Sequence, residues 1–129
     1  MWRKAGVVVL LSACLGGIRL AGGQYVPAEP QYAHVPYVCD TRPAVLLFAN
    51  GSWEPAEELV IFFDKVVTLK TEQIRVIIGR GAIGRIWPSA GIGKFFKIYF
   101  EPSLQSWGVV EVKVIPCDAK VIKALWITN

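Results

Sequence analysis

A glycine-rich basic segment in the middle of the chain is the strongest candidate for chemistry. It runs from Gly79 to Pro88, reads GRGAIGRIWP, and is followed by two further lysines. Glycines let backbone N–H groups approach an anion, and arginine donates forked hydrogen bonds to sulfate, phosphate or carboxylate. An indole beside such a site stacks on a sugar ring or a base. The predicted anion-binding residues are Arg80, Arg85, Trp87, Lys94 and Lys97.

The charge distribution around this segment supports the same interpretation. Residues 65–99 carry seven Lys or Arg and one Glu, a net charge of +6, whereas residues 24–64 have a net charge of −5. A basic block of this kind suits an anionic glycan, such as a glycosaminoglycan or lipopolysaccharide, or an anionic lipid headgroup. The alternative is a solvated loop whose arginines form ion pairs with the acidic N-terminal half.

Two nucleotide-binding motifs are incomplete in this region. The sequence from Gly79 to Gly84 formally reads GxGxxG, but a dinucleotide site also needs a helix that begins there. Pro88 and the absence of a helical pattern argue against that helix. Lys94 is followed by Phe95, where a phosphate-binding loop carries the Ser or Thr that binds magnesium. Neither motif therefore predicts a nucleotide site.

Groups that could perform catalysis are scarce. The chain has one histidine, His34, which lies in a Pro- and Tyr-rich segment where nothing nearby would orient it. Glu57 and Glu58 are sequence neighbours, so they point in different directions and make a poor acid–base pair. We therefore expect no enzymatic activity, no cofactor and no metal site.

The N-terminus predicts export. Two basic residues precede the apolar run from Ala5 to Leu11, which is typical of a secretory signal peptide and too short to span a bilayer. Cleavage before Gln24 removes residues 1–23 and leaves 11 basic and 10 acidic residues, a net charge of +1. That balance argues against a nucleic-acid partner. The alternative is lipidation of Cys14, because Leu11 to Cys14 (LSAC) resembles a lipobox and would anchor the protein to the cell envelope.

The cysteine pattern agrees with export. Cys39 and Cys117 remain after the leader is removed, and an even pair in an oxidising compartment predicts one disulfide. Closing a loop of about 80 residues stabilises a fold by roughly 4 kcal/mol in the chain-entropy model. Two free buried thiols in a reducing cell are the alternative.

Short apolar segments separated by turn residues predict an all-β domain over residues 39–129, after an extended Pro-rich lead-in over residues 24–38. We expect an antiparallel β-sandwich, or a partly open barrel, of about seven strands with one disulfide. Near residues 55–65 a proline and acidic residues at the start make a short helix the alternative to a strand. The expected strands are 44–48, 59–63, 65–69, 73–78, 95–100, 108–115 and 121–128.

Several loop residues carry further predictions. Trp53, Trp87 and Trp107 lie at segment ends, where we expect them to close the ends of the core, with a carbohydrate platform as the alternative. Trp126, in the last apolar segment, is expected in the core. Asn50 begins an Asn-Gly-Ser sequon, a candidate glycosylation site in a secreted eukaryotic protein, although Asn-Gly also forms turns.

These observations predict a secreted, non-enzymatic binding module. Its expected partner is an anionic glycan, a lipid headgroup or an extracellular protein. A lipidated envelope protein is one alternative. The other is a carrier of hydrophobic ligands, because strands such as residues 95–100 are apolar on both faces.

Overall fold

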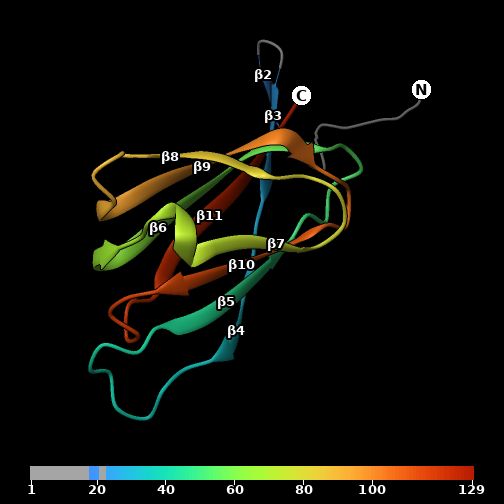
Figure 1. Ribbon diagram of the computed structural model, residues 1–129. Helices are drawn as coiled ribbons and strands as arrows, with labels where there is room; N and C mark the ends of the chain where they lie inside the picture. Colours follow the sequence, from blue (N-terminus) through green and yellow to red (C-terminus); the bar gives the residue numbers. More distant parts are fainter. Residues whose placement is uncertain (1–17, 21–22) are drawn as a thin grey trace.

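Two antiparallel β-sheets face each other and enclose the core of the molecule (Figure 1). The computed structural model describes residues 18–20 and 23–129, and 62% of these residues lie in strands. The architecture fits the predicted sandwich, and the all-β prediction is confirmed.

The order of the strands decides which residues become neighbours. The four-stranded sheet has the order β4 (Pro30–His34), β5 (Ala44–Ala49), β10 (Val109–Val114) and β7 (Ile74–Ile78). The six-stranded sheet has the order β2 (Ile18–Leu20), β3 (Gly23–Pro27), β11 (Val121–Thr128), β6 (Ala56–Thr68), β9 (Ile92–Leu104) and β8 (Ile83–Trp87). One turn of 3-10 helix, η1 (Thr71–Gln73), precedes β7.

Alternation along the strands fills the space between the sheets. In β10, Val110 and Val112 are fully buried, and Val112 pairs with the equally buried Leu46 of β5. On the opposite sheet, Phe96 and Ile98 of β9 are fully buried. Because side chains of a strand alternate between its two faces, the residues between these core positions point outward.

The segment at residues 55–65 is a strand and not a helix. Strand β6 merges two of the expected strands and lies between β11 and β9, so both of its edges are hydrogen-bonded. From Ile61 to Asp64 burial alternates, with Ile61 and Phe63 buried and Phe62 and Asp64 exposed, which is the two-residue period of a strand. Pairing on both sides and a composition rich in β-branched and aromatic residues outweigh the helix-like first turn.

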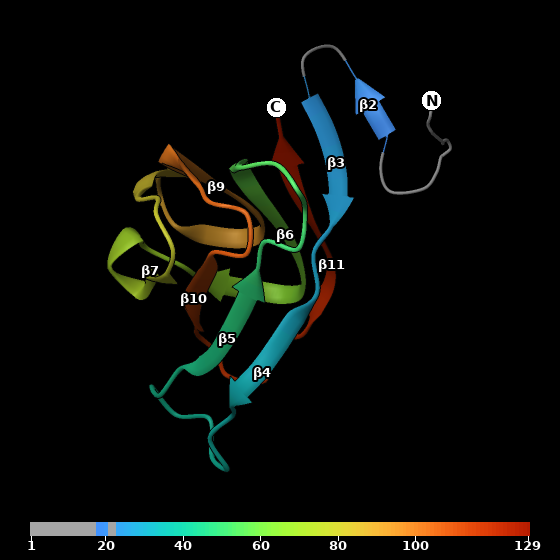
Figure 2. The same ribbon diagram turned by 90° about the vertical axis from the view of Figure 1, so that its right-hand side faces the viewer.

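Four strands lie where no strand was expected, and the first of them, β2, lies within the expected leader. The Pro-rich lead-in contains β3, beside β11, and β4, beside β5, so the chain passes from one sheet to the other (Figure 2). The glycine-rich segment contains β8. Strands β4 and β8 lie at sheet edges, where proline and glycine are tolerated because one side of the strand needs no partner.

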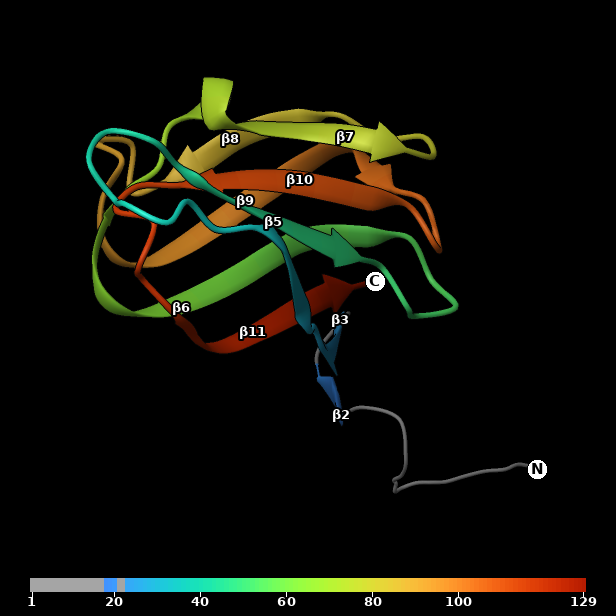
Figure 3. The same cartoon turned by 90° about the horizontal axis from the view of Figure 1, so that it is seen from below.

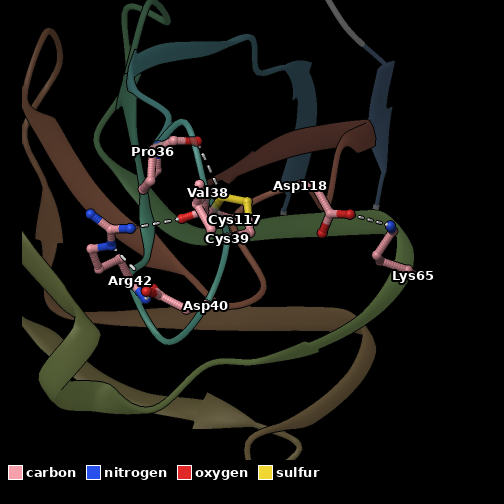
Figure 4. The surroundings of a disulfide bond; sticks show 8 residues. All are labelled: Pro36, Val38, Cys39, Asp40, Arg42, Lys65, Cys117 and Asp118. Carbon is pink, nitrogen blue, oxygen red and sulfur yellow. Dashed lines mark hydrogen bonds and ion pairs between the residues drawn. A yellow bond between two sulfur atoms is a disulfide. The ribbon is translucent and has the colours of Figure 1, made fainter.

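The predicted disulfide joins Cys39, in the loop after β4, to Cys117, in the loop after β10 (Figure 4). A disulfide points to an oxidising, extracellular compartment. Cys14 and most of the expected signal peptide, residues 1–17 and 21–22, lie outside the described residues. The last part of that expected leader is described, and Ile18–Leu20 form β2, which pairs with β3. Within residues 18–20 and 23–129, no helix is long and apolar enough to cross a membrane.

Candidate functional site

Three of the five predicted anion-binding residues lie on one face of the six-stranded sheet. Strands β8 and β9 are antiparallel, and their register pairs Trp87 with Lys97 and Arg85 with Tyr99. Ile86, between Arg85 and Trp87, is buried in the core. Alternation therefore directs Arg85, Trp87 and Lys97 to the outer, solvent side of the sheet.

The same outer face continues across β6 and β11. The register pairs Phe95 with Phe62 and Phe62 with Lys123, so one row of side chains runs across three strands. We call the residues of this row together with the neighbouring pair of β8 and β9 the outer-face site. Its members are Phe62, Trp87, Phe95, Lys97 and Lys123.

Aromatic rings form the floor of the outer-face site. The ring centroids of Phe62 and Phe95 are 4.5 Å apart, with planes tilted by 31°. Trp87 meets Phe95 edge to face, with centroids 5.8 Å apart. The ammonium nitrogen of Lys97 lies 6.0 Å from the centroids of both Trp87 and Phe95. These contacts are those of cation–π and aromatic pairs, and they hold a cation beside flat apolar surfaces.

A shallow hollow of about 370 Å³ follows the middle of this face. Lys97 and Lys123 both line it, and Glu58 is the one acidic residue among the lining side chains. Its remaining lining is apolar or aromatic and comes from Tyr25, Val60, Phe62, Phe95, Leu125 and Ile127. The hollow therefore combines an apolar floor with two cations and one anion.

Arg85 stands at the border between the basic and the acidic part of this face. Its guanidinium carbon lies 3.8 Å from the centroid of the Tyr99 ring. A second hollow, of about 290 Å³, is lined by Arg85 together with Glu57, Glu58 and Glu101. Among the described residues Arg85 makes no ion pair within 4.0 Å. Nearby acids weaken its attraction for an anion, so Lys97 and Lys123 are the stronger candidates.

Arg80 and Lys94 lie apart from the outer-face site. The N–H of Arg80 donates to the side-chain oxygen of Gln105 at 2.9 Å, which places Arg80 beyond the end of β9. Lys94 lies near the start of β9, and alternation directs it to the other side of the strand from Phe95 and Lys97. The five predicted residues therefore divide into three that share a face and two that do not.

The glycines of this segment serve packing. Gly81 has φ +141°, and a Cβ there would lie 2.8 Å from the Cα of Leu104. The N–H of Ala82 donates to the carbonyl of Pro102 at 3.2 Å. Since this N–H and that of Arg80 already have partners inside the protein, an anion would be held by side chains of the sheet face.

Asn50 is fully buried and ties two loops together. Its amide nitrogen donates to the carbonyls of Glu54, Leu104 and Gln105, at 3.0, 3.2 and 3.3 Å. Its side-chain oxygen accepts hydrogen bonds from the backbone and hydroxyl of Ser52. This arrangement favours the turn interpretation of Asn-Gly. A glycan on the amide would require the whole network to open.

The expectation that loop tryptophans close the core is wrong. The exposed fractions are 87% for Trp53, 49% for Trp87 and 61% for Trp107. The buried core consists instead mainly of aliphatic and aromatic residues of the strands. Trp126 is buried, as expected, and its ring centroid lies 6.2 Å from that of Phe100.

The resolved pKa shifts lie near the disulfide and not at the outer-face site (Figure 4). The side-chain hydrogen bond with Lys65, at 2.9 Å, lowers the pKa of Asp118 and raises that of Lys65. The side-chain hydrogen bond from Arg42 lowers the pKa of Asp40. Both pairs, Lys65 with Asp118 and Arg42 with Asp40, lie on the surface. Their pKa shifts are those of structural ion pairs.

Sequence reasoning missed Phe62, Phe95 and Lys123 as members of the site. The alternation in residues 95–100 contained a signal for Phe95, because the second face of that strand is partly apolar. No signal identified Lys123, which reaches the site because β11 and β9 are both neighbours of β6. The chain matches no protein-family model, no curated protein and no solved structure closely enough to infer a relative.

Proposed function

We propose that this chain is a non-enzymatic extracellular binding module whose outer-face site holds an anionic polysaccharide. The observation that carries the proposal is the placement of Lys97 and Lys123, from two strands that are not adjacent, at one aromatic-floored hollow. Aromatic rings offer flat surfaces to sugar rings, and the two ammonium groups offer charge to sulfate or carboxylate substituents.

The open shape of the site supports a polymer over a small molecule. The hollow lies on a sheet face bordered by β8, an edge strand, and all of its lining side chains except the buried Val60 are half-buried or exposed. Small-molecule sites are concave and bury most of their ligand. A polysaccharide chain can instead lie along the face and meet Trp87 at the edge and Lys123 three strands away.

Heparin, a sulfated polysaccharide, is the probe for this proposal. Replacing both site lysines (Lys97→Gln and Lys123→Gln) should weaken binding. The slope of log affinity against log salt should become less steep by about two, one for each lost contact between an ammonium group and a sulfate. The matched control removes the same charge elsewhere, by Arg80→Gln and Lys94→Gln. We expect the control to keep most of the affinity.

One further variant separates stacking from charge. Trp87→Ala should lower heparin affinity while the salt slope stays unchanged, because an indole contributes no charge. Equal losses in the site variant and the charge-matched control would contradict the proposal. They would mean that heparin responds to net charge alone.

A further inference from the structure

Two indole side chains are exposed to solvent at one end of the sandwich, outside the proposed polysaccharide site. Trp53 is 87% exposed in the loop between β5 and β6, and Trp107 is 61% exposed in the loop between β9 and β10. Figure 3 shows these loops at the same end as the loop between β7 and β8, on the right of the view. Large apolar side chains left in water at one place mark an interaction site.

The β9–β10 loop touches both of the other loops. The N–H of Trp107 donates to the carbonyl of Asn50 at 2.7 Å, and a Cβ on Gly51 would lie 3.8 Å from the Trp107 ring. A Cβ on Gly79 would lie 3.0 Å from the Cα of Gly108, which brings the β7–β8 loop to the same place. Ile78, 56% exposed, immediately precedes that loop. We call Trp53, Ile78 and Trp107 the tryptophan end.

The backbone of the two tryptophan-bearing loops is restrained within the fold itself. Trp107 has φ +66°, a left-handed conformation that a residue with a Cβ adopts at an energetic cost and keeps when its surroundings enforce it. The buried Asn50 amide supplies that restraint, because it donates to carbonyls of both tryptophan-bearing loops. The backbone that carries the two indoles therefore needs little ordering when they bind.

The chemistry of this end fits a lipid interface better than a sugar or a protein. Ile78 adds an aliphatic side chain, which lipid acyl chains accommodate and a sugar's hydroxyl groups do not match. Indoles bury about 150–250 Å² each. The surface area of two indoles is smaller than the area that one partner contributes to a stable protein interface, which is about 800 Å². Tryptophan is moreover the side chain most enriched where lipid headgroups meet acyl chains.

We propose that the tryptophan end inserts into the interfacial layer of a lipid bilayer and docks the domain on a membrane surface. The exposed charges beside it, Arg80 and Glu54, are opposite in sign, so insertion depends on apolar contact and needs no anionic lipid. Binding should therefore respond weakly to salt, unlike polysaccharide binding at the outer-face site.

The test measures partition of the full chain onto phosphatidylcholine vesicles by flotation. The double variant carries Trp53→Ser and Trp107→Asn, since asparagine accepts the left-handed conformation at position 107. It should lose affinity by about tenfold for each indole. The control, Trp87→Ser, removes an exposed indole elsewhere and should bind as the unaltered chain does. Any contribution from the N-terminal segment is equal in all three proteins.

Two results would overturn the proposal. One is equal partition of the double variant and the unaltered chain, while circular dichroism shows both folded. The other is that the unaltered chain does not partition onto the vesicles, while its tryptophan fluorescence shifts when dextran, a neutral polysaccharide, is added. That second outcome would assign the tryptophan end to sugar stacking. Partition that persists at about 0.5 M salt and disappears in the double variant supports insertion.

Discussion

Replacing Asn50 with alanine should destabilise the fold more than any other single polar substitution in the loops. The change removes three donated hydrogen bonds, to the carbonyls of Glu54, Leu104 and Gln105, and two accepted ones from Ser52. The carbonyl of Leu104 loses a buried hydrogen bond, and a buried polar group that loses its partner costs about 1–3 kcal/mol. The other partners are partly buried and add smaller losses, so we expect about 3–5 kcal/mol in total.

Urea unfolding followed by circular dichroism measures this loss. With a typical dependence of about 2 kcal/mol per molar urea, the midpoint should fall by about 2 M. Asn50→Asp keeps the oxygen that accepts from Ser52 but turns the donor into an anionic oxygen facing three carbonyls. It should be at least as destabilising at pH 7 and partly recover at low pH, where the carboxyl group is protonated and donates again.

A shift below about 1 kcal/mol for Asn50→Ala would refute this reasoning. It would mean that water replaces the amide at no cost and that Asn50 does not fix the two loops. Ser106→Ala is the milder comparison, since it removes one hydroxyl that donates to the carbonyl of Ser52. We expect that variant to lose about 0.5–1.5 kcal/mol.

Three further predictions concern stability. Replacing Cys39 and Cys117 with serine should lower the free energy of unfolding by about 4–5 kcal/mol, because the bridge closes a separation of 78 residues; urea unfolding measures it. Gly81→Ala should lower the thermal midpoint by several degrees, because the new Cβ would lie 2.8 Å from the backbone at the end of β9. The lowered pKa of Asp118 adds stability that is present above its ordinary value of 3.8 and is lost as pH falls through the folded value. The raised pKa of Lys65 adds stability that is present below 10.5 and is lost as pH rises through the folded value, so Asp118→Asn should flatten both limbs of a pH–stability curve.

The sequence was informative wherever a local period decided the outcome. The side chains of residues 95–100 are expected to alternate between the two faces of a strand. The structure buries Phe96, Ile98 and Phe100, while Phe95 and Lys97 face outward. The even pair of cysteines that remains after the expected leader, Cys39 and Cys117, likewise led to the correct bridge. These features depend on neighbouring residues and on the number of cysteines, and both can be read directly from a sequence.

Features that depend on strand order could not be read this way. Lys123 meets Phe62 only because β11 and β6 are neighbours, and nothing near either residue specifies that pairing. The helix that was the alternative to a strand near residues 55–65 does not form for the same reason, since hydrogen bonding to two adjacent strands overrides a local signal. The exposure of Trp53 and Trp107 depends on how completely other side chains fill the core.

The most direct test of the central proposal is the footprint of a heparin oligosaccharide on the protein, mapped by NMR chemical shifts. We expect the largest changes at Trp87, Phe95 and Lys97, together with Phe62 and Lys123 on the neighbouring strands of the same face. The tryptophan end should remain unchanged. Shifts confined to the loop around Arg80, or spread over every exposed lysine, would contradict the assignment of polysaccharide binding to the outer face of the six-stranded sheet.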